Sequence, residues 1–225
     1  MKNIIITGTS RGIGLELALQ LAESGHQILA LSRKTNELLI KHPNIHCLSI
    51  DLSKPETFET VEHFLLKTWK NVDVVIHNAG SLVLKPFSEL TLEDFQNVYN
   101  VNVFGVARLT QIALPYMSKG AHVVALSSMG GIQGSMKFAG LSAYSSSKGA
   151  VITLMELLAE EYKEHGISFN TLALGAVQTE MLQEAFPGYQ APISAQDMAA
   201  YIADFSINGN RFYNGKVLQV SSSTP

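Results

Sequence analysis

Short runs of aliphatic and β-branched residues alternate with longer stretches of helical periodicity along most of the chain. The run Asn3–Thr7 precedes an apolar pattern of helical period from Ile13 to Ala22, and a second run covers 27–31, which together predict a βαβ unit. Further strands are expected over 45–50, 72–76, 121–126, 167–174 and 216–220, with helices near 56–69, 92–117, 144–165 and 195–205. This alternation predicts an α/β fold, a doubly wound parallel sheet of about seven strands with helices on both faces.

Length and composition describe one folded domain. The 225 residues, 46% hydrophobic and 16% charged, suit a single α/β domain spanning 1–225. No stretch reaches the roughly eighteen apolar residues of a membrane span, and with a net charge of −3 and no block of Lys or Arg we expect no nucleic-acid or membrane partner. The lone Cys47 and the lack of a secretory leader favour a cytoplasmic protein, and 221–225 are expected to form a frayed tail.

Two helix starts are marked by local chemistry. Thr91 followed three residues later by Asp94 is typical of a capping box, in which each residue bonds the other's backbone N–H. Ser53 ahead of Pro55 is expected to begin another helix, because proline is favoured in the first turn.

The segment directly after the first strand is rich in glycine. It reads Thr7-Gly8-Thr9-Ser10-Arg11-Gly12-Ile13-Gly14, which places glycines in a strand-to-helix turn. Free N–H groups and the positive end of the helix dipole favour a pyrophosphate at such a helix start. An ordinary tight turn is the alternative, but the position after the first strand favours nucleotide binding.

The residues after the second strand bear on which dinucleotide would bind. A carboxylate at this place would hydrogen-bond the ribose diol of NAD, whereas the chain reads Leu31-Ser32-Arg33-Lys34. Arg33 can pair with the 2′-phosphate of NADP, and Arg11 in the glycine loop can complete a clamp. We therefore expect NADP(H), the alternative being that Arg33 and Lys34 are merely solvated.

Tyr144 and Lys148 lie four positions apart in an expected helix, so their side chains share a face. The Lys148 ammonium would favour the phenolate and lower a tyrosine pKa that starts near ~10. A tyrosine tuned in this way can exchange a proton near neutral pH. Taken alone, the pair also fits a solvated lysine beside a half-buried ring.

Further motifs follow the glycine loop in a fixed order. They are Asp51-Leu52 after the third strand, His77-Asn78-Ala79-Gly80 after the fourth, Asn102 inside the next helix, Ser127-Ser128 at the end of the fifth strand, and Tyr144 with Lys148. In this order they resemble the motifs of the short-chain dehydrogenase/reductase family, and the resemblance extends from Ile4 to Val220.

The resemblance implies a Rossmann-type fold and reversible hydride transfer between NADP(H) and a ketone or aldehyde, giving an alcohol. Tyr144 would exchange the proton, Ser128 would hydrogen-bond the same oxygen, Lys148 would lower the tyrosine pKa and hold the nicotinamide ribose, and Asn102 would anchor a water relay. The implied cofactor contacts are Gly8, Ser10, Arg11, Gly12, Ile13, Gly14, Arg33, Asp51, Leu52, Asn78, Ala79, Gly80, Tyr144, Lys148, Val177 and Thr179. No metal is expected, and a homodimer or homotetramer is implied.

The chain departs from the family pattern in three places. Ser128 and Tyr144 are 16 positions apart (144 − 128), about three more than is usual, which assigns an insertion to 129–141 and leaves Ser127 and Ser142 as alternatives to Ser128. The usual proline before Gly175 is missing. His77 stands where the family has asparagine, and we expect it to be a hydrogen-bonded structural residue rather than a base.

Two variable segments are expected to border the substrate, the insertion and a lid at about 180–193. Both are fairly apolar, which predicts an apolar substrate, although core packing or a subunit interface would use the same side chains equally well. The side chains are those of Met129, Ile132, Met136, Phe138, Leu182, Phe186 and Tyr189.

Two other functions fit parts of the pattern. A non-catalytic NADP(H)-binding sensor would use the same fold without needing Ser128, Tyr144 and Lys148 together. A sugar-nucleotide epimerase of the extended branch would need a larger C-terminal domain than the 77 residues (225 − 148) that follow Lys148.

Overall fold

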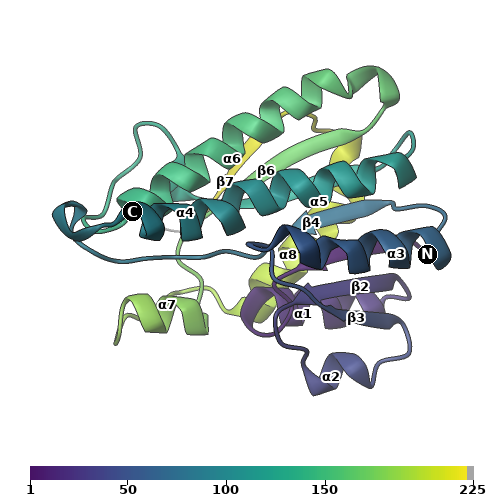
Figure 1. Ribbon diagram of the computed structural model, residues 1–225, viewed down its shortest axis with the longest axis horizontal. Helices are drawn as coiled ribbons and strands as arrows, with labels where there is room; N and C mark the ends of the chain where they lie inside the picture. Colours follow the sequence, from purple (N-terminus) through teal and green to yellow (C-terminus); the bar gives the residue numbers. More distant parts are fainter. Residues whose placement is uncertain (222–225) are drawn as a thin grey trace.

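The computed structural model describes residues 1–221, which contain a seven-stranded sheet in the order β3-β2-β1-β4-β5-β6-β7. Every neighbouring pair of strands is parallel. The expected α/β architecture, a single Rossmann-type domain, is confirmed (Figure 1). The strands are β1 (Asn3–Thr7), β2 (Gln27–Ser32), β3 (Ile45–Ser49), β4 (Val74–His77), β5 (His122–Ser128), β6 (Ser168–Leu174) and β7 (Val217–Val220).

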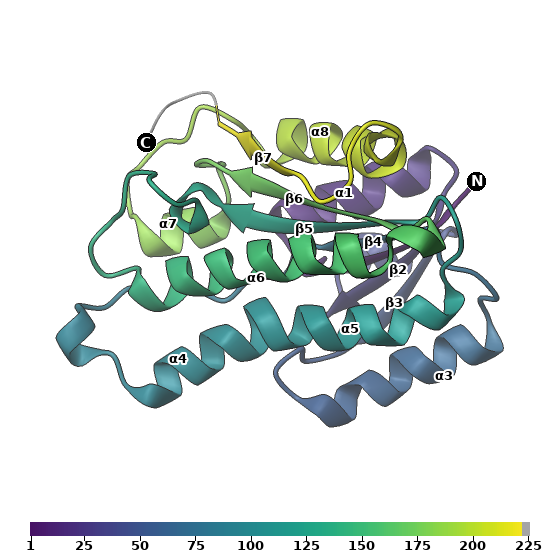
Figure 2. The same cartoon turned by 90° about the horizontal axis from the view of Figure 1, so that it is seen from above.

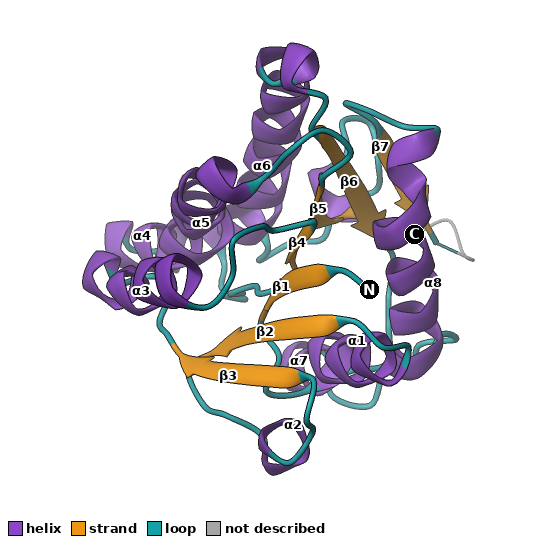
Figure 3. Ribbon diagram, turned by 90° about the vertical axis from the view of Figure 1, so that its right-hand side faces the viewer, coloured by secondary structure: helices purple, strands orange, loops and turns teal. Residues whose placement is uncertain are grey.

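Helices cover both faces of the sheet. Figure 3 shows α3 (Glu59–Lys67), α4 (Leu92–Tyr99), α5 (Gly105–Ala113) and α6 (Ser142–Glu161) on one face, with α1 (Gly12–Glu23) and α8 (Ala195–Asn208) on the other. Two short helices complete the set, α2 (Glu37–Ile40) and α7 (Glu180–Ala185).

The alternation of side chains along each strand produces two separate apolar cores. Ile5 packs with the core beneath α3, α5 and α6, whereas its neighbours Ile4 and Ile6 pack on the opposite face with residues of α1 and α8. All three isoleucines are fully buried. A strand that is apolar at every position is therefore buried on both sides, as expected of a parallel sheet.

The strand order reverses between β1 and β4, the neighbours at which the two halves of the sheet diverge. In open parallel sheets, ligands bind outside the carboxyl ends of the strands at this place. Figure 2 shows the carboxyl ends of β5 and β6 directed toward the side where α7 and the loops before α4 and α6 gather. This end of the sheet brings together the glycine loop and the segments that follow β4, β5 and β6.

The stretch expected as one helix over 92–117 is divided. α4 passes into a turn of π-helix at Asn100–Phe104, α5 follows, and a 3₁₀ turn at Leu114–Tyr116 ends the segment. A π turn inserts one residue into the helical ladder, and such turns are frequent at functional sites. Asn102 lies inside this turn.

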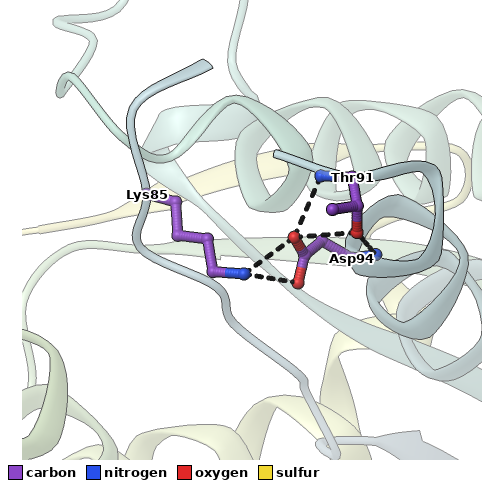
Figure 4. A network of polar contacts seen from close by, with 3 residues as sticks. All are labelled: Lys85, Thr91 and Asp94. Atoms are coloured by element: carbon purple, nitrogen blue, oxygen red, sulfur yellow. Dashed lines mark hydrogen bonds and ion pairs between the residues drawn. The ribbon is translucent and has the colours of Figure 1, made fainter. Parts of the chain in front are cut away.

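The start of α4 has the expected capping box, which is thereby confirmed. Thr91 Oγ1 accepts from the Asp94 N–H at 3.1 Å, and Asp94 Oδ2 accepts from the Thr91 N–H at 3.0 Å (Figure 4). Lys85 Nζ donates to both Asp94 oxygens at 3.0 and 2.9 Å, and the Lys85 N–H donates to Gly140 O at 3.1 Å. These bonds tie the loop before α4 to the end of the 129–141 insertion.

The expected start at Ser53 is wrong. The segment before α3 is a 3₁₀ turn, Pro55–Phe58, with Lys54 as its N-cap and no side-chain cap. The Ser53 N–H and hydroxyl both donate to Asp51 Oδ1, at 3.0 and 2.7 Å, so Ser53 belongs to a turn held by Asp51 and does not cap the helix. Within residues 1–221 no helix is long and apolar enough to cross a membrane. Apart from Ser221, the tail expected at 221–225 lies outside the described residues.

Candidate active site

The glycine loop joins β1 to α1 with a backbone that only glycine adopts easily. Gly8 and Gly12 have φ values of +74° and +56°. A Cβ on Gly14 would stand 2.2 Å from Gly8 O, so the loop folds tightly on itself. Within the described residues no side chain caps α1, which leaves its first N–H groups for an anion. These features fit a nucleotide phosphate at the start of α1.

Asn78 fastens this loop to β4. Its Nδ2 donates to Thr7 O at 2.9 Å and to Gly8 O at 3.1 Å, and the Ala79 N–H donates to Thr7 Oγ1 at 3.0 Å. Gly80 lies deeper in the site, because a Cβ there would be 3.7 Å from Lys148 Nζ and 3.8 Å from Asn102 Oδ1. The predicted contacts Asn78, Ala79 and Gly80 thus connect the glycine loop to the candidate catalytic residues.

His77 is buried at the end of β4. Its Nε2 lies 2.9 Å from Thr110 Oγ1, and burial lowers its pKa to about 3. The imidazole is therefore neutral and hydrogen-bonded, which agrees with the structural role expected from the sequence.

Residues expected near the adenosine part of a dinucleotide surround the ends of β2 and β3. Arg33 is exposed, and the Ser10 carbonyl accepts from Asn36 Nδ2 at 3.2 Å. Burial would raise the Asp51 pKa, but hydrogen bonds from Ser53 leave it below its ordinary value. This region presents a cation at Arg33 and a carboxylate, Asp51, that is occupied by its own turn.

Arg11 is placed differently from the expected clamp. Its guanidinium forms a bidentate ion pair with Glu184 of α7, in which Nη1 meets Oε1 and Nη2 lies 2.9 Å from Oε2. The sequence predicted a role opposite Arg33 and gave no sign of Glu184 as a partner, because 173 positions separate the pair.

Tyr144 lies half-buried near the start of α6. Its side chain is hydrogen-bonded to that of Ser128, at the end of β5. Lys148, one turn later, is only 5% exposed. Its Nζ lies 5.8 Å from the centroid of the Tyr144 ring and donates to Leu126 O at 2.7 Å. The structure thus brings Ser128, Tyr144 and Lys148 together.

The ionisation of this pair differs from the expectation. Burial raises the Tyr144 pKa, and the hydrogen bond with Ser128 only partly offsets the increase. Burial also lowers the pKa of Lys148 to about 8. The predicted lowering of the Tyr144 pKa by Lys148 is therefore wrong for this arrangement, because the loss of solvent around the phenol disfavours the phenolate and sets the direction of the shift.

The three candidate serines have distinct surroundings. Ser128 Oγ accepts from the Gly130 N–H at 3.2 Å and also contacts Tyr144. Ser127 is 4% exposed and donates to Lys148 O at 2.8 Å, which ties β5 to α6. The Ser142 hydroxyl is buried without a hydrogen-bond partner among the described residues. Of the three, Ser128 is the serine with a described bond to the tyrosine.

Asn102 is almost completely buried in the π turn. Its Oδ1 accepts from the Ser81 N–H at 2.7 Å, and its Nδ2 donates to Ser81 O and Ser147 Oγ, both at 2.9 Å. The side chain therefore fixes the β4–α4 loop against α6. Ser81 and Ser147 were not predicted, and Ser147 carries no signal beyond its position next to Lys148.

The two cofactor contacts predicted after β6, Val177 and Thr179, have different surroundings. Val177 is 6% exposed and packs in the core beneath α8, so only its backbone could face a cofactor. Thr179 is the N-cap of α7, with Oγ1 accepting from the Leu182 N–H at 3.2 Å. Between α1 and α7 lies a pocket of about 490 Å³ whose lining includes Gly12, Leu15, Glu16, Thr179, Glu180 and Glu184.

The insertion after Ser128 is held by its own polar groups. Lys137 Nζ donates to Gly130 O at 2.8 Å, Ile132 O at 2.6 Å and Ser135 Oγ at 2.8 Å. A Cβ on Gly131 would stand 2.7 Å from the Lys148 carbonyl carbon, so the insertion packs directly on the helix that carries Tyr144. Residues 1–221 contain no group of His, Cys, Asp and Glu side chains suited to a metal ion.

The chain is similar to known proteins in both sequence and structure. A family model described as short chain dehydrogenase matches residues 2–190. An NADPH-dependent pterin aldehyde reductase from Arabidopsis thaliana is 31% identical over 204 residues, 85% of this chain and 83% of the relative. An uncharacterized oxidoreductase from Schizosaccharomyces pombe is 32% identical over 79% of this chain, which spans 61% of that relative's length.

A solved structure extends the similarity to the whole fold. The short chain dehydrogenase from Burkholderia cenocepacia J2315, in complex with NADP, superposes with a TM-score of 0.88 and is 25% identical, covering 99% of this chain and 97% of the other. Together with the family match and the seven-stranded parallel sheet, these similarities show that the chain belongs to the short-chain dehydrogenase/reductase family, whose oxidoreductases use nicotinamide cofactors.

Proposed function

We propose that the protein is an NADP(H)-dependent oxidoreductase that transfers a hydride reversibly between NADPH and a ketone or aldehyde, with Tyr144 as the general acid and base. The observation that carries the proposal is the contact of the Tyr144 side chain with Ser128, together with Lys148 Nζ at 5.8 Å from the tyrosine ring. A bound NADPH would supply the hydride, and the chain would supply position and a proton.

Tyr144 suits the role of proton donor during reduction. Because burial raises its pKa, the phenol stays protonated at neutral pH and can hydrogen-bond a carbonyl oxygen. As negative charge develops on that oxygen, the phenol gives up its proton. Ser128, already bonded to Tyr144, would donate its hydroxyl hydrogen to the same oxygen.

Lys148 would support Tyr144 from the buried side of α6. A lysine with a pKa of about 8 changes its charge near neutral pH, and charged Lys148 would stabilise the phenolate left after proton transfer. Its position beside Gly80 also suits a contact with the nicotinamide ribose. Asn102, whose side chain is bonded within the protein, would act by holding the π turn and its backbone groups in place.

A preference for NADP(H) is supported by charge at the end of β2. The chain has no carboxylate in Ser32-Arg33-Lys34, and exposed Arg33 can meet a 2′-phosphate. The pterin aldehyde reductase to which the chain is similar is described as NADPH-dependent, and the Burkholderia structure contains NADP.

An apolar substrate is supported by the segments that flank the site. Met136 and Phe138 of the insertion and Tyr189 of the lid are 57%, 48% and 47% exposed. Lys137 is the only charged residue of the insertion, and its three N–H groups donate to acceptors within the insertion. It is therefore poorly placed to bind an anionic substrate. A ketone or aldehyde with a sizeable apolar part fits these surroundings.

A homodimer or homotetramer is part of the proposal. Leu92, Phe104 and Leu157, on or between α4, α5 and α6, are 74%, 60% and 64% exposed, which is typical of surfaces that become covered on assembly. A cytoplasmic location is proposed from the single free cysteine, Cys47.

Consumption of NADPH against a panel of aldehydes, ketones, diketones and quinones tests the function. We expect turnover with at least one apolar carbonyl and recovery of the corresponding alcohol. Folded protein that binds NADPH tightly but reduces no member of the panel would contradict the proposal and favour a nucleotide-binding sensor.

A further inference from the structure

The ion pair between Arg11 and Glu184 joins the glycine loop to the lid. Arg11 immediately precedes α1, and Glu184 belongs to α7. The guanidinium meets both carboxylate oxygens, and such bidentate pairs combine charge with a fixed geometry. The side chains are 46% and 62% exposed, so the pair is weak enough for a better anion to replace the carboxylate.

A second carboxylate of α7 faces the same loop. Glu180 lies one helical turn before Glu184, and its Oε2 is 3.3 Å from the place of a Cβ on Gly12. Glu180 influences Arg11 through its charge but forms no ion pair within residues 1–221. Two negative side chains therefore lie beside a loop whose shape suits phosphate.

The position of α7 depends on few contacts. At its base the Gln178 N–H donates to Ile193 O and the Ala191 N–H to Gln178 Oε1, both at 2.8 Å. Between these anchors the segment that contains α7 extends away from the sheet (Figure 1). Within the described residues, the ion pair between Arg11 and Glu184 links α7 to the glycine loop. Arg11 is also the glycine-loop residue that the sequence predicts to bind the 2′-phosphate of NADP(H) together with Arg33.

We infer that Glu184 reduces the preference for NADP(H) over NAD(H) by competing with the 2′-phosphate of NADP(H) for Arg11. This inference rests on the proposed use of NADP(H). Binding of NADPH requires Arg11 to exchange a carboxylate for a phosphate, whereas NADH carries no 2′-phosphate and leaves the ion pair intact. Glu184 therefore weakens the binding of NADPH but not that of NADH, and it reduces the difference in affinity between the two cofactors.

Dissociation constants of NADPH and NADH, measured by titration calorimetry on wild type, Glu184→Gln and Glu180→Gln, test the inference. Glutamine keeps the size of the side chain and removes its charge. We expect Glu184→Gln to tighten NADPH binding about two- to fivefold, the scale of an exposed ion pair, and to leave NADH binding unchanged. Glu180→Gln is the matched control, because it removes an equal charge from α7 but no ion pair with Arg11, and it should change the ratio of the two dissociation constants less than Glu184→Gln does.

A double-mutant cycle isolates Arg11. In an Arg11→Ala background, Glu184→Gln should no longer change NADPH affinity relative to NADH. Equal effects of Glu184→Gln on both cofactors, or weaker NADPH binding, would overturn the inference while leaving the proposed function in place. If the wild type binds NADH but not NADPH, the inference and the proposed preference for NADP(H) both fail, because a two- to fivefold effect of Glu184 cannot abolish NADPH binding. If it binds neither nucleotide, both the inference and the proposed function fail.

Discussion

Lys148 Nζ lies 5.8 Å from the centroid of the Tyr144 ring and donates its hydrogen bond to the Leu126 carbonyl. The two side chains share one face of α6, as the spacing of four residues requires, but the ammonium is directed to the end of β5 rather than to the phenol oxygen. Burial therefore governs both groups and moves their pKa values apart, that of Tyr144 upward and that of Lys148 down to about 8.

Replacing Lys148 with methionine should alter the dependence of stability on pH. In the folded protein the Lys148 pKa is about 8, below its ordinary value of 10.5, so the unfolded chain binds more protons between these values and stability rises with pH. Denaturant unfolding at pH 7 to 10 should show wild type gaining about 3 kcal/mol relative to Lys148→Met. Parallel curves for the two proteins would mean that Lys148 is not desolvated.

The two serines at the end of β5 should have separable effects. Ser128→Ala is expected to lower kcat about 100-fold with little change in stability, because it removes a hydroxyl that contacts Tyr144. Ser127→Ala should lower the free energy of unfolding by about 1 kcal/mol, since it removes the buried hydrogen bond from the Ser127 hydroxyl to the Lys148 carbonyl. Steady-state kinetics and urea unfolding of both variants check this, and reversed effects would exchange the assignments.

His77 should make the protein sensitive to acid. Its folded pKa of about 3 lies below the ordinary 6.5, so between these values the unfolded chain binds a proton that the folded protein does not. The contribution of His77 to the free energy of unfolding is therefore fully present above pH 6.5. It decreases as the pH falls toward 3, by up to about 1.4 kcal/mol per pH unit. His77→Asn should flatten this decrease in unfolding experiments between pH 7 and 4. His63→Asn, at an exposed position on α3, is the control, and equal slopes for the two variants would contradict the prediction.

Arg33→Ala should separate the two nicotinamide cofactors. The exposed guanidinium is expected to contact the 2′-phosphate alone, so its removal should raise the Kd of NADPH about tenfold, as for one charge-assisted contact, and leave that of NADH unchanged. Fluorescence titration of the bound nicotinamides measures both constants. A similar loss for both cofactors would place Arg33 away from the 2′-phosphate.

The strands of the sheet could be predicted from the sequence, because a short, continuously apolar run such as Asn3–Thr7 is typical of a parallel strand that is buried on both faces. The sequence was not sufficient for the π turn, since one extra residue hardly disturbs helical periodicity, and the turn is fixed by bonds from Asn102 to Ser81 and Ser147. α7 was expected only as part of a lid. Its six residues give little periodicity, and its start is set by the Thr179 cap.

The candidate site was predictable to a similar degree. The glycine loop and the Tyr144–Lys148 spacing depend on local sequence, so the structure places them as the sequence suggests. The direction of the Tyr144 pKa depends on how the insertion and β5 bury the phenol, which spacing along a helix does not reveal. The Arg11–Glu184 pair likewise arises from tertiary placement, because the two residues come from opposite ends of the chain.

Tyr144→Phe, examined for both turnover and NADPH affinity, tests the central claim most directly. Removal of the phenol hydroxyl should lower kcat/KM for the best carbonyl substrate by about 10²- to 10⁴-fold, the usual contribution of a general acid. The Kd of NADPH should stay within about twofold of wild type, because the cofactor contacts proposed for the glycine loop and Arg33 are untouched. Turnover comparable to wild type in a variant that still binds NADPH would contradict Tyr144 as the proton donor.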